Sequence, residues 1–359
     1  MKTYSVLTII SFLITILASI DFKTLMSGTA KSVVVMEEIP VFVVLVQYTT
    51  STITASFLVN SANIGIFNKL AKIDAVLEAE SISDYYKRSR METYGFLFFL
   101  VLSHLINIII ELVTAEDVTV HALIVLPLYF IQKLEIVAFC KYIAMVKRRL
   151  VLINDHLKVF VQEQEKKKNN KTIFSVSKSN PDPKENVEIK FIGRAVDGNT
   201  KIRDLASMYD VIGRICSVIN EVFNFQIFMT LVSTFTYVVI TIWSSLYYYR
   251  TPASNSGELI NTAIWCFSAI YTVGVMSLAC EQLLLVRNET RVLVNKIIMN
   301  YDLPNSMRVQ AKAFMELVEA WSLRIYIYDL FSVDITLMLK FISVATTYLI
   351  VIIQISHFV

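Results

Sequence analysis

The sequence predicts an all-α membrane protein with seven transmembrane helices, a cytoplasmic N-terminus and an extracellular C-terminus. Of its 359 residues, 55% are hydrophobic, and the mean hydropathy of +0.58 is unusually high for a soluble domain. Several apolar runs are long enough to cross a bilayer as a single helix. Basic residues are concentrated in alternate connecting segments, and this asymmetry predicts the orientation of the chain in the membrane.

The first apolar run covers 4–20 and follows directly after Met1 and Lys2. Its length lies between that of the apolar part of a signal peptide and that of a spanning helix. Ala18 and Ser19 offer a small-residue cleavage site. A cleaved signal peptide is therefore the alternative to a retained first helix.

Six further segments have the length and composition of transmembrane helices. We expect them at 33–59, 94–113, 121–146, 221–249, 259–286 and 335–356. Between the fourth and fifth lies a long polar region. Its central part, 163–190, is rich in Lys, Glu, Ser and Asn and is too polar to bury a core, so we expect a disordered cytoplasmic linker there.

Two polar regions keep helical periodicity outside the predicted spans. The segment 202–219 is amphipathic and leads into the fifth span. A second helix is predicted from Asn305, and its apolar residues recur at helical spacing at Phe314, Leu317, Trp321 and Tyr328. Each of these helices needs a packing partner, either within the chain or in another subunit.

The distribution of Lys and Arg predicts which loops are cytoplasmic. Nearly all of the 33 basic residues lie at the N-terminal tip or in 60–93, 147–220 and 287–334. The regions on the other side contain only Lys23, Lys31 and Arg250. By the positive-inside rule, the N-terminus is inside and the C-terminus outside.

The sequence contains no constellation typical of an enzyme. Its four histidines lack metal-ligand spacing, and it has neither a phosphate-binding Gly loop nor a nucleophile elbow. We therefore expect no catalytic activity, no metal and no cofactor. The Lys-rich linker is predicted to be a solvated loop, not a nucleic-acid-binding segment.

The last predicted span carries a polar stripe. One helical face collects Lys340, Ser343, Thr347 and Gln354. Ile350 and Val351 interrupt this stripe with an aliphatic step. A polar stripe in a membrane helix should not face lipid, so it either packs against neighbouring helices or lines a water-filled pore in which the aliphatic step forms a gate.

The outer halves of the middle spans carry aromatic rings with scattered hydrogen-bonding groups. This composition suits a small, neutral, partly polar ligand. The candidate ligand-binding residues are His104, Asn107, Glu111, Tyr129, Trp243, Asn261 and Trp265. The alternative is that these side chains serve helix packing and the membrane interface.

Lys133 lies midway along the fourth predicted span. An unpaired charge at that depth costs at least about 2.5 kcal/mol, so Lys133 is expected to meet water or a carboxylate. Glu111 is one candidate partner. Glu135 is a poorer one, because residues two positions apart do not share a helix face.

Thr347 and Tyr348, followed by five apolar residues and Gln354, resemble the C-terminal signature of insect gustatory receptors. That signature usually ends in Phe, where this chain has Ile355. The predicted topology also resembles that family, and the resemblance covers nearly the whole chain. The main sugar-receptor branch often has Glu after Thr-Tyr, whereas Leu349 occupies that position here; the fructose-type and bitter-type branches stay open.

The resemblance implies a ligand-gated nonselective cation channel that works without G proteins. It implies four subunits, as a homotetramer or a heterotetramer with other gustatory receptors, joined by the cytoplasmic helices. A tastant such as a sugar or bitter compound, permeant cations and membrane lipid are the implied partners, and the location is the plasma membrane of gustatory neurons. Ile350, Val351 and Gln354 are implied to form the constriction, with Tyr348 coupling the pore helix to its neighbours. The family also favours a retained helix at 4–20, preceded in most members by a longer N-terminus.

Two other classes are weighed against this interpretation. A secondary transporter would use Lys133 and Glu111 as coupling charges, but such proteins are built from internal repeats, none of which is visible here. A non-conducting seven-helix receptor would signal through the long inner loop.

Overall fold

The computed structural model describes Ile10, Ile14 and the segments 31–53, 60–76, 80–114, 120–173, 191–249 and 256–358. Apart from those two isoleucines, the first predicted span lies outside the described residues. The elements are α2 (Lys31–Ile53), α3 (Asn60–Val76), α4 (Glu80–Thr114), α5 (Val120–Ile173), α6 (Lys201–Tyr249), α7 (Ser256–Met299), α8 (Asn305–Ala320), β1 (Tyr326–Ile327), β2 (Phe331–Ser332) and α9 (Ile335–Phe358).

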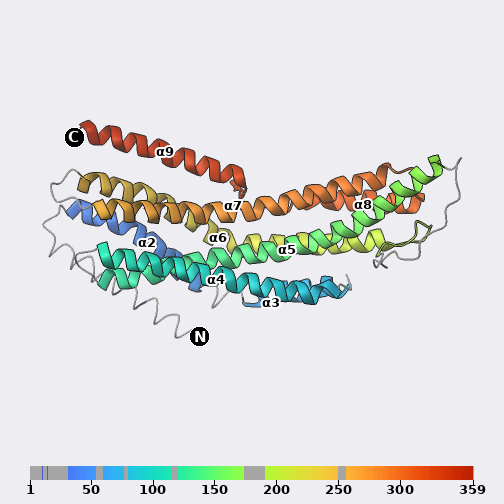
Figure 1. The fold of residues 1–359 in the computed structure, drawn as a ribbon, viewed down its shortest axis with the longest axis horizontal. Coiled ribbons are helices and arrows are strands. Elements are labelled where there is room, and N and C mark those ends of the chain that lie inside the picture. Colours follow the sequence, from blue (N-terminus) through green and yellow to red (C-terminus); the bar gives the residue numbers. More distant parts are fainter. Residues whose placement is uncertain are drawn as a thin grey trace.

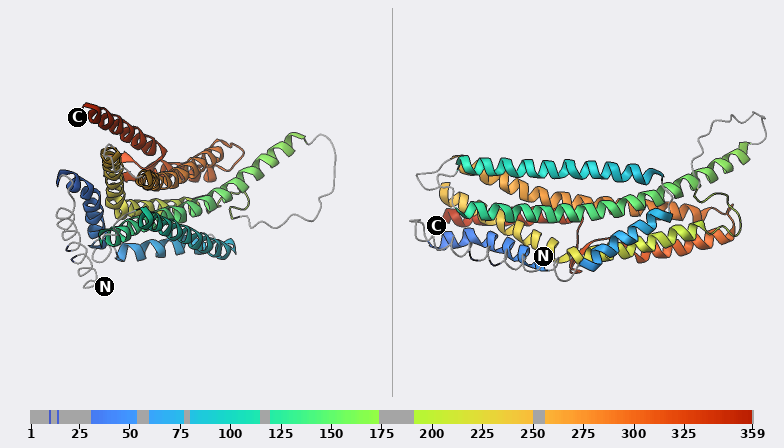
Figure 2. Two further views of the ribbon diagram at one scale, coloured as in Figure 1. Left: turned by 60° about the vertical axis from the view of Figure 1, so that its left-hand side comes forward. Right: turned by 90° about the horizontal axis from the view of Figure 1, so that it is seen from below.

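The helices form an elongated bundle. Figure 1 shows α5, α6 and α7 running along most of its length, with α2 and α9 at one end and α8 at the other. Helix α5 packs against α7, and α2 packs against α6. Helix α4 packs against α7 (Figure 2).

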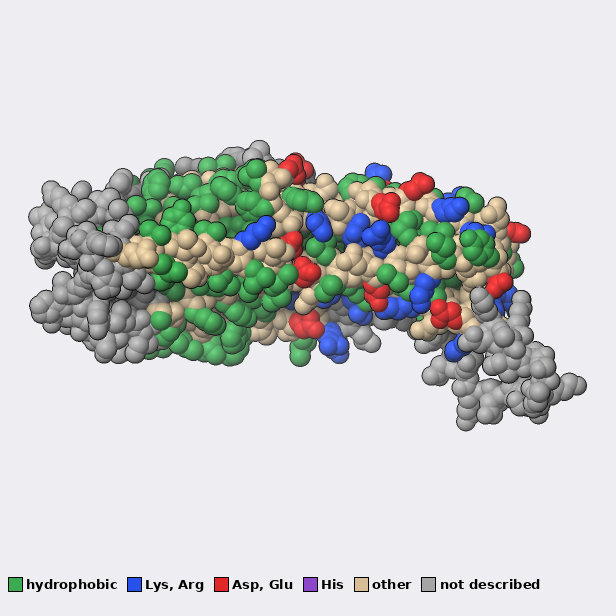
Figure 3. All heavy atoms as spheres, turned by 90° about the horizontal axis from the view of Figure 1, so that it is seen from above, with side chains coloured by type: hydrophobic (Ala, Val, Ile, Leu, Met, Phe, Trp, Pro, Cys, Tyr) green, Lys and Arg blue, Asp and Glu red, His purple; other side chains and the backbone are tan. Residues whose placement is uncertain are grey.

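The two ends of the bundle differ in surface chemistry. Figure 3 shows apolar side chains covering one end, which we call the apolar end, while Lys, Arg, Asp and Glu gather toward the other, the charged end. Large apolar side chains such as Phe98 and Phe267 are 70% and 72% exposed. Such a belt is stable only in contact with lipid or another protein. Among the described residues, α6 and α7 contain stretches long and apolar enough to cross a membrane.

Three helices continue far beyond the predicted spans into the charged end. Helix α5 reaches Ile173, so 163–173, which was predicted to be disordered, is helical; the rest of that linker lies outside the described residues. A buried apolar stripe at helical spacing, formed by Ile143, Val146, Leu150, Ile153 and Leu157, carries α5 past its predicted end at 146, and the helix continues beyond the stripe. Because burying each such side chain contributes about 1.5–3 kcal/mol, the stripe stabilises the extension despite its polar outer face.

Helix α8 packs against α6 and α7 through a stripe of fully buried residues, namely Met307, Ala311, Phe314 and Val318. The helix ends at Ala320, which corrects the prediction that Trp321 and Tyr328 continue it. Trp321 is the residue at which the backbone becomes extended, and Tyr328 lies in a tight turn with φ of 47°.

A short antiparallel hairpin connects α8 to α9. Tyr326 pairs with Ser332 and Ile327 pairs with Phe331. Helix α6 holds this hairpin, because the side-chain oxygens of Asn220 and Asn224 each accept a hydrogen bond of 2.9 Å, from the backbone amides of Tyr326 and Tyr328. The two asparagines are one turn apart and therefore present both acceptors on one helix face.

Trp321 anchors the end of α8 to α6 by packing and by hydrogen bonds. Its ring lies directly on the backbone of Gly213, where a Cβ atom would stand 2.3 Å from the ring carbon Cγ. The indole Nε1 donates a hydrogen bond of 2.9 Å to Asp210, and Tyr209 donates one of 3.0 Å to the Trp321 carbonyl. Burial raises the pKa of Tyr209 to about 12, so this phenol remains a donor at neutral pH.

A buried ion pair joins α3 to α5. The Arg149 guanidinium makes two hydrogen bonds to the Asp74 carboxylate, of 3.0 Å from Nε and 2.7 Å from Nη2. Tyr86 on α4 donates to the same carboxylate at 2.6 Å. Arg149 is 1% exposed, so this contact lies away from water.

Candidate functional site

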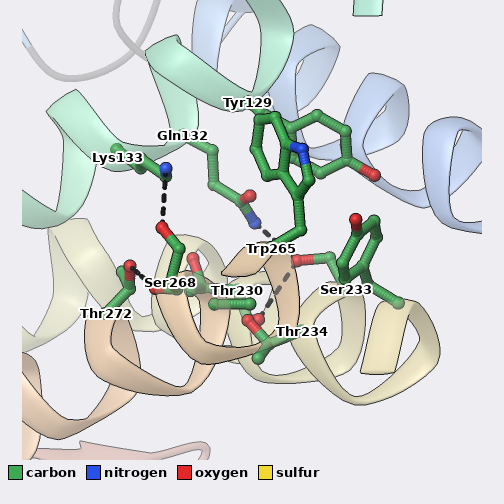
Figure 4. Close-up of a pocket in the computed structure, with 11 residues that line it drawn as sticks. Tyr129, Gln132, Lys133, Thr230, Ser233, Thr234, Trp265, Ser268 and Thr272 are labelled. Carbon is green, nitrogen blue, oxygen red and sulfur yellow. Dashed lines mark hydrogen bonds between the residues drawn. The ribbon is translucent and has the colours of Figure 1, made fainter. Parts of the chain in front are cut away.

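A small pocket lies between α5, α6 and α7 within the apolar end (Figure 4). Its walls are made of aromatic rings, hydroxyl groups, one amide and one ammonium group, and we call it the inner pocket. Its lining is Tyr129, Gln132, Lys133, Thr230, Ser233, Thr234, Tyr237, Trp265, Ser268, Ala269 and Thr272. The cavity has a volume of about 30 Å³, which is room for water but not for a larger molecule.

Three aromatic rings form one wall of the inner pocket. Tyr129 contacts Tyr237 edge-on, with 5.6 Å between ring centroids, and lies 6.0 Å from Trp265. Such tilted arrangements are favourable because the positive edge of one ring meets the negative face of another. The rings come from all three helices, so a rotation of any one of them changes the pocket.

Lys133 contacts a hydroxyl group and an aromatic ring that were not among its predicted partners. Its ammonium donates a hydrogen bond of 2.9 Å to the Ser268 hydroxyl and lies 5.2 Å from the Trp265 ring centroid (Figure 4). Glu135 instead accepts a hydrogen bond from Gln47 on α2. Among the residues that the structure describes, no carboxylate pairs with Lys133; the side chain of Glu111 is outside them. A hydroxyl dipole and an aromatic face thus stabilise the charge.

A polar network borders the inner pocket. The Gln47 amide donates to Glu135 and to Thr230, in each case at 3.1 Å. Gln132 donates to the Gln47 side-chain oxygen at 2.8 Å and also to Ser233. Gln47 is 1% exposed, and this network therefore ties α2, α5 and α6 together where water is excluded.

Of the predicted ligand-binding residues whose side chains the structure describes, Tyr129 and Trp265 line the inner pocket. His104 is buried against Phe130 on α5, with ring centroids 5.0 Å apart, and its Nδ1 has no hydrogen-bond partner among the described residues. Trp243 lies on α6 but is not part of the lining. For the remaining three, Asn107, Glu111 and Asn261, the backbone is helical and the side chains are outside what is described.

Four residues of α6 line the inner pocket, although none of them was predicted from the sequence as a ligand-binding residue. Thr230, Ser233, Thr234 and Tyr237 all line the pocket, and their spacing of three, one and three residues puts them on one helix face. This stripe is visible in the sequence as a polar face within an apolar span. It is therefore a signal of the same kind as the stripe in the last span.

The predicted pore residues lie on α9, and all seven have exposed side chains: Lys340, Ser343, Thr347, Tyr348, Ile350, Val351 and Gln354. The polar stripe thus does not pack against helices of its own chain. The Thr347 hydroxyl donates to the Ser343 carbonyl at 2.9 Å, which satisfies the hydroxyl within the helix.

Helix α9 is held to the bundle by contacts of individual side chains with α6 and α7. The Phe235 ring of α6 meets Tyr348 and Phe341 edge-on, at centroid distances of 5.4 and 6.3 Å. Gly274 of α7 allows a close approach, since a Cβ atom there would stand 3.2 Å from the Met338 sulfur. Of the three aromatic residues, Tyr348 belongs to the Thr-Tyr motif and links it directly to α6.

The described residues contain no cluster of His, Cys, Asp or Glu arranged to hold a metal ion. All four cysteines are free thiols.

A helical bundle with an apolar belt at one end is the architecture of a polytopic membrane protein. The chain belongs to the 7tm chemosensory receptor family, whose sequence profile matches residues 1–357. The fold class predicted from the sequence is thereby confirmed.

Solved structures with the same fold come from insect olfactory receptors. The chain is similar to the olfactory receptor OR5 of Machilis hrabei, with a TM-score of 0.65 and 13% identity, over 98% of this chain and 89% of that one. Against the same receptor in complex with eugenol, the TM-score is 0.57 and the identity 15%, over 99% of this chain and 89% of that one. Comparison with curated protein sequences finds no match.

Proposed function

We propose that this chain is a gustatory receptor of the chemosensory family that works as a ligand-gated nonselective cation channel. The observation that carries the channel proposal is the exposure of the polar stripe on α9, from Lys340 to Gln354. In a bilayer, such a stripe needs water or partner subunits, because lipid leaves polar groups unsatisfied. Four copies arranged around their α9 helices supply both, with Ile350 and Val351 at the narrow point.

The inner pocket is the proposed tastant site. Its rings, hydroxyls and single ammonium suit a small neutral compound with acceptor oxygens, which includes sugars and bitter compounds. The complex of a related olfactory receptor with eugenol supports a small organic ligand. Because a cavity of about 30 Å³ is too small for such a compound, the ligand must select a conformation in which Tyr129 or Trp265 has moved. That difference in affinity between conformations is what can open the gate.

Whole-cell recording from cells that express the full chain tests the proposal. Application of a tastant panel should produce a cation current that blocking of G proteins leaves intact. Uptake of the compound without current would instead identify a transporter, and a G-protein-dependent response without current would identify a non-conducting receptor. Either result overturns the channel proposal.

Two substitutions test the gate. Gln354→Ala and Ile350→Ala should each change the basal current or the relative permeability to cations, because each alters the polarity or the width of the narrow point. Ile342→Ala is the matched control, since Ile342 is exposed on α9 but lies outside the polar stripe. If both gate variants conduct and gate like the parent protein, the assignment of the pore to α9 is wrong.

Loss of the Trp265 ring should weaken tastant binding. We expect Trp265→Ala to raise the half-maximal tastant concentration by about 10-fold to 100-fold, which corresponds to the removal of one aromatic anchor from a binding site. Single-channel conductance should not change, because the pocket is separate from α9. Trp243→Ala is the control, as Trp243 does not line the pocket. Equal effects of both variants would contradict the site.

A further inference from the structure

A second cavity opens on the outer surface of the apolar end. It is a groove between α4, α5 and α7 with a volume of about 370 Å³, within the range of small-molecule sites. We call it the lateral groove. Most of its wall is apolar, and the lining includes Phe96, Phe99, Val137, Phe267 and Tyr271. Phe99 and Phe267 are 62% and 72% exposed, so the groove is open toward the lipid side.

One cation lies in the wall of this apolar groove. Lys133 lines the lateral groove as well as the inner pocket, and its only hydrogen bond among the described residues goes to the uncharged Ser268 hydroxyl. An ammonium at such depth is strongly stabilised by an anion, because water is scarce and the local dielectric constant is low. The groove therefore combines a long apolar surface with a single positive charge at its inner wall.

We propose that the lateral groove binds the carboxylate of a single-chain fatty acid that enters from the bilayer. The acyl chain would lie along Phe96, Phe99 and Phe267, and the ionised carboxylate would accept a hydrogen bond from Lys133. A phospholipid fits less well, because its large headgroup stays at the membrane interface while Lys133 lies midway along its span. This binding does not depend on the tastant site or on channel activity.

The proposal has a consequence for the inner pocket. Lys133, Ser268 and Thr272 line both cavities, so they form the partition between them. A carboxylate that attracts the Lys133 ammonium competes with the Ser268 hydroxyl and the Trp265 ring for the same charge. The acid therefore acts directly on the wall of the proposed tastant site.

Fluorescence quenching tests the proposal, because Trp265 lies 5.2 Å from the Lys133 ammonium. The full-length protein is placed in nanodiscs of phosphatidylcholine, and a brominated fatty acid or a brominated alcohol of equal chain length is added at matched mole fractions in the lipid. The acid, ionised at the pH used, should quench Trp265 at about tenfold lower mole fraction than the alcohol, as expected for one charge-assisted hydrogen bond. The signal is assigned to Trp265 by its loss in Trp265→Phe.

Three variants determine what the quenching means. Lys133→Met should remove the preference for the acid, while Lys141→Met, on the same helix but outside the groove, should keep it. Val137→Phe fills the groove and retains the ammonium, so it should weaken quenching by both compounds. Equal quenching by acid and alcohol in the parent protein, or an unchanged preference in Lys133→Met, overturns the proposal. A chain without tastant currents that still shows the preference would refute only the proposed function.

Discussion

Replacing Arg149 with Met should destabilise the protein by about 3–5 kcal/mol, the usual cost of removing one partner from a buried ion pair. Among the described residues, the variant leaves the Asp74 carboxylate, whose side chain is 10% exposed, with the Tyr86 hydroxyl as its one hydrogen-bond donor. Burial and the hydrogen bond to Asp74 raise the pKa of Tyr86, so it stays a neutral phenol that donates to the carboxylate but supplies no positive charge. Thermal unfolding in detergent measures the effect, with a thiol-reactive dye that detects the buried cysteines as they become exposed.

Two comparisons separate the ion pair from a general effect of losing an Arg. Arg88→Met removes an ion pair with Glu92 whose side chains are 83% and 59% exposed, and it should cost less than about 1 kcal/mol. The double variant Arg149→Met with Asp74→Leu removes both charges and should recover most of the lost stability. If Arg149→Met unfolds at the same temperature as Arg88→Met, the buried pair contributes nothing measurable.

The second large effect is expected for Gly213→Ala. The added methyl group would stand 2.3 Å from Cγ of Trp321, a distance at which the ring and the helix backbone must separate. Overpacking of this kind costs about 1–3 kcal/mol or more, which outweighs the gain in helix propensity of at most about 1 kcal/mol. Moving Trp321 also breaks its hydrogen bond to Asp210. The same thermal assay should therefore show a lower unfolding temperature.

The chain offers a matched control in Gly65, which is also helical and has no neighbouring atom within 4 Å of an added Cβ. Gly65→Ala should leave stability unchanged or raise it slightly. In a Trp321→Leu background, Gly213→Ala should cost much less, because the two sites are in contact and their effects are not additive. Equal costs with and without the indole would contradict the assigned contact.

The membrane-embedded part of the fold could be predicted because a helix in contact with lipid requires a long apolar segment. Spans such as 259–286 are long and apolar, and they lie within observed helices. The charged end was harder to predict, because its helices bury one stripe and expose charges elsewhere. The polar composition after Glu163 predicted a disordered linker, whereas α5 continues as a helix to Ile173. The end of α8 could not be predicted either, because no glycine marks the turns that follow Trp321. Leu323, Tyr328 and Asp329 adopt positive φ there, which residues other than glycine seldom do.

The site was predictable only where residue type alone was informative. Aromatic residues within spans identified Tyr129 and Trp265, which do line the inner pocket. The contribution of Thr230 and Ser233 depends on how α6 is rotated against α5 and α7, and that rotation is set by packing across the whole bundle. For the same reason the contact between Lys133 and Ser268 could not be predicted from the sequence. Ser268 is 135 residues away in the sequence, and only the bundle brings it within hydrogen-bonding distance.

Helix α9 is attached to the bundle mainly near its N-terminal end, so it can tilt about that end like a lever. Its first turns are tied to the bundle by the hairpin, Met338 and Phe341, and Tyr348 meets Phe235 farther along. Figures 1 and 2 show the far end of α9, beyond these contacts, standing apart from α6 and α7. A helix of 24 residues is about 36 Å long, so a tilt of about 5° at the base displaces its tip by about 3 Å. The displacement grows with distance from the pivot, and Gln354 therefore moves several times farther than Lys340. In the tetramer that we propose, a rotation too small to disturb the packing at the hairpin would change the separation of the four helix tips by more than the diameter of a water molecule.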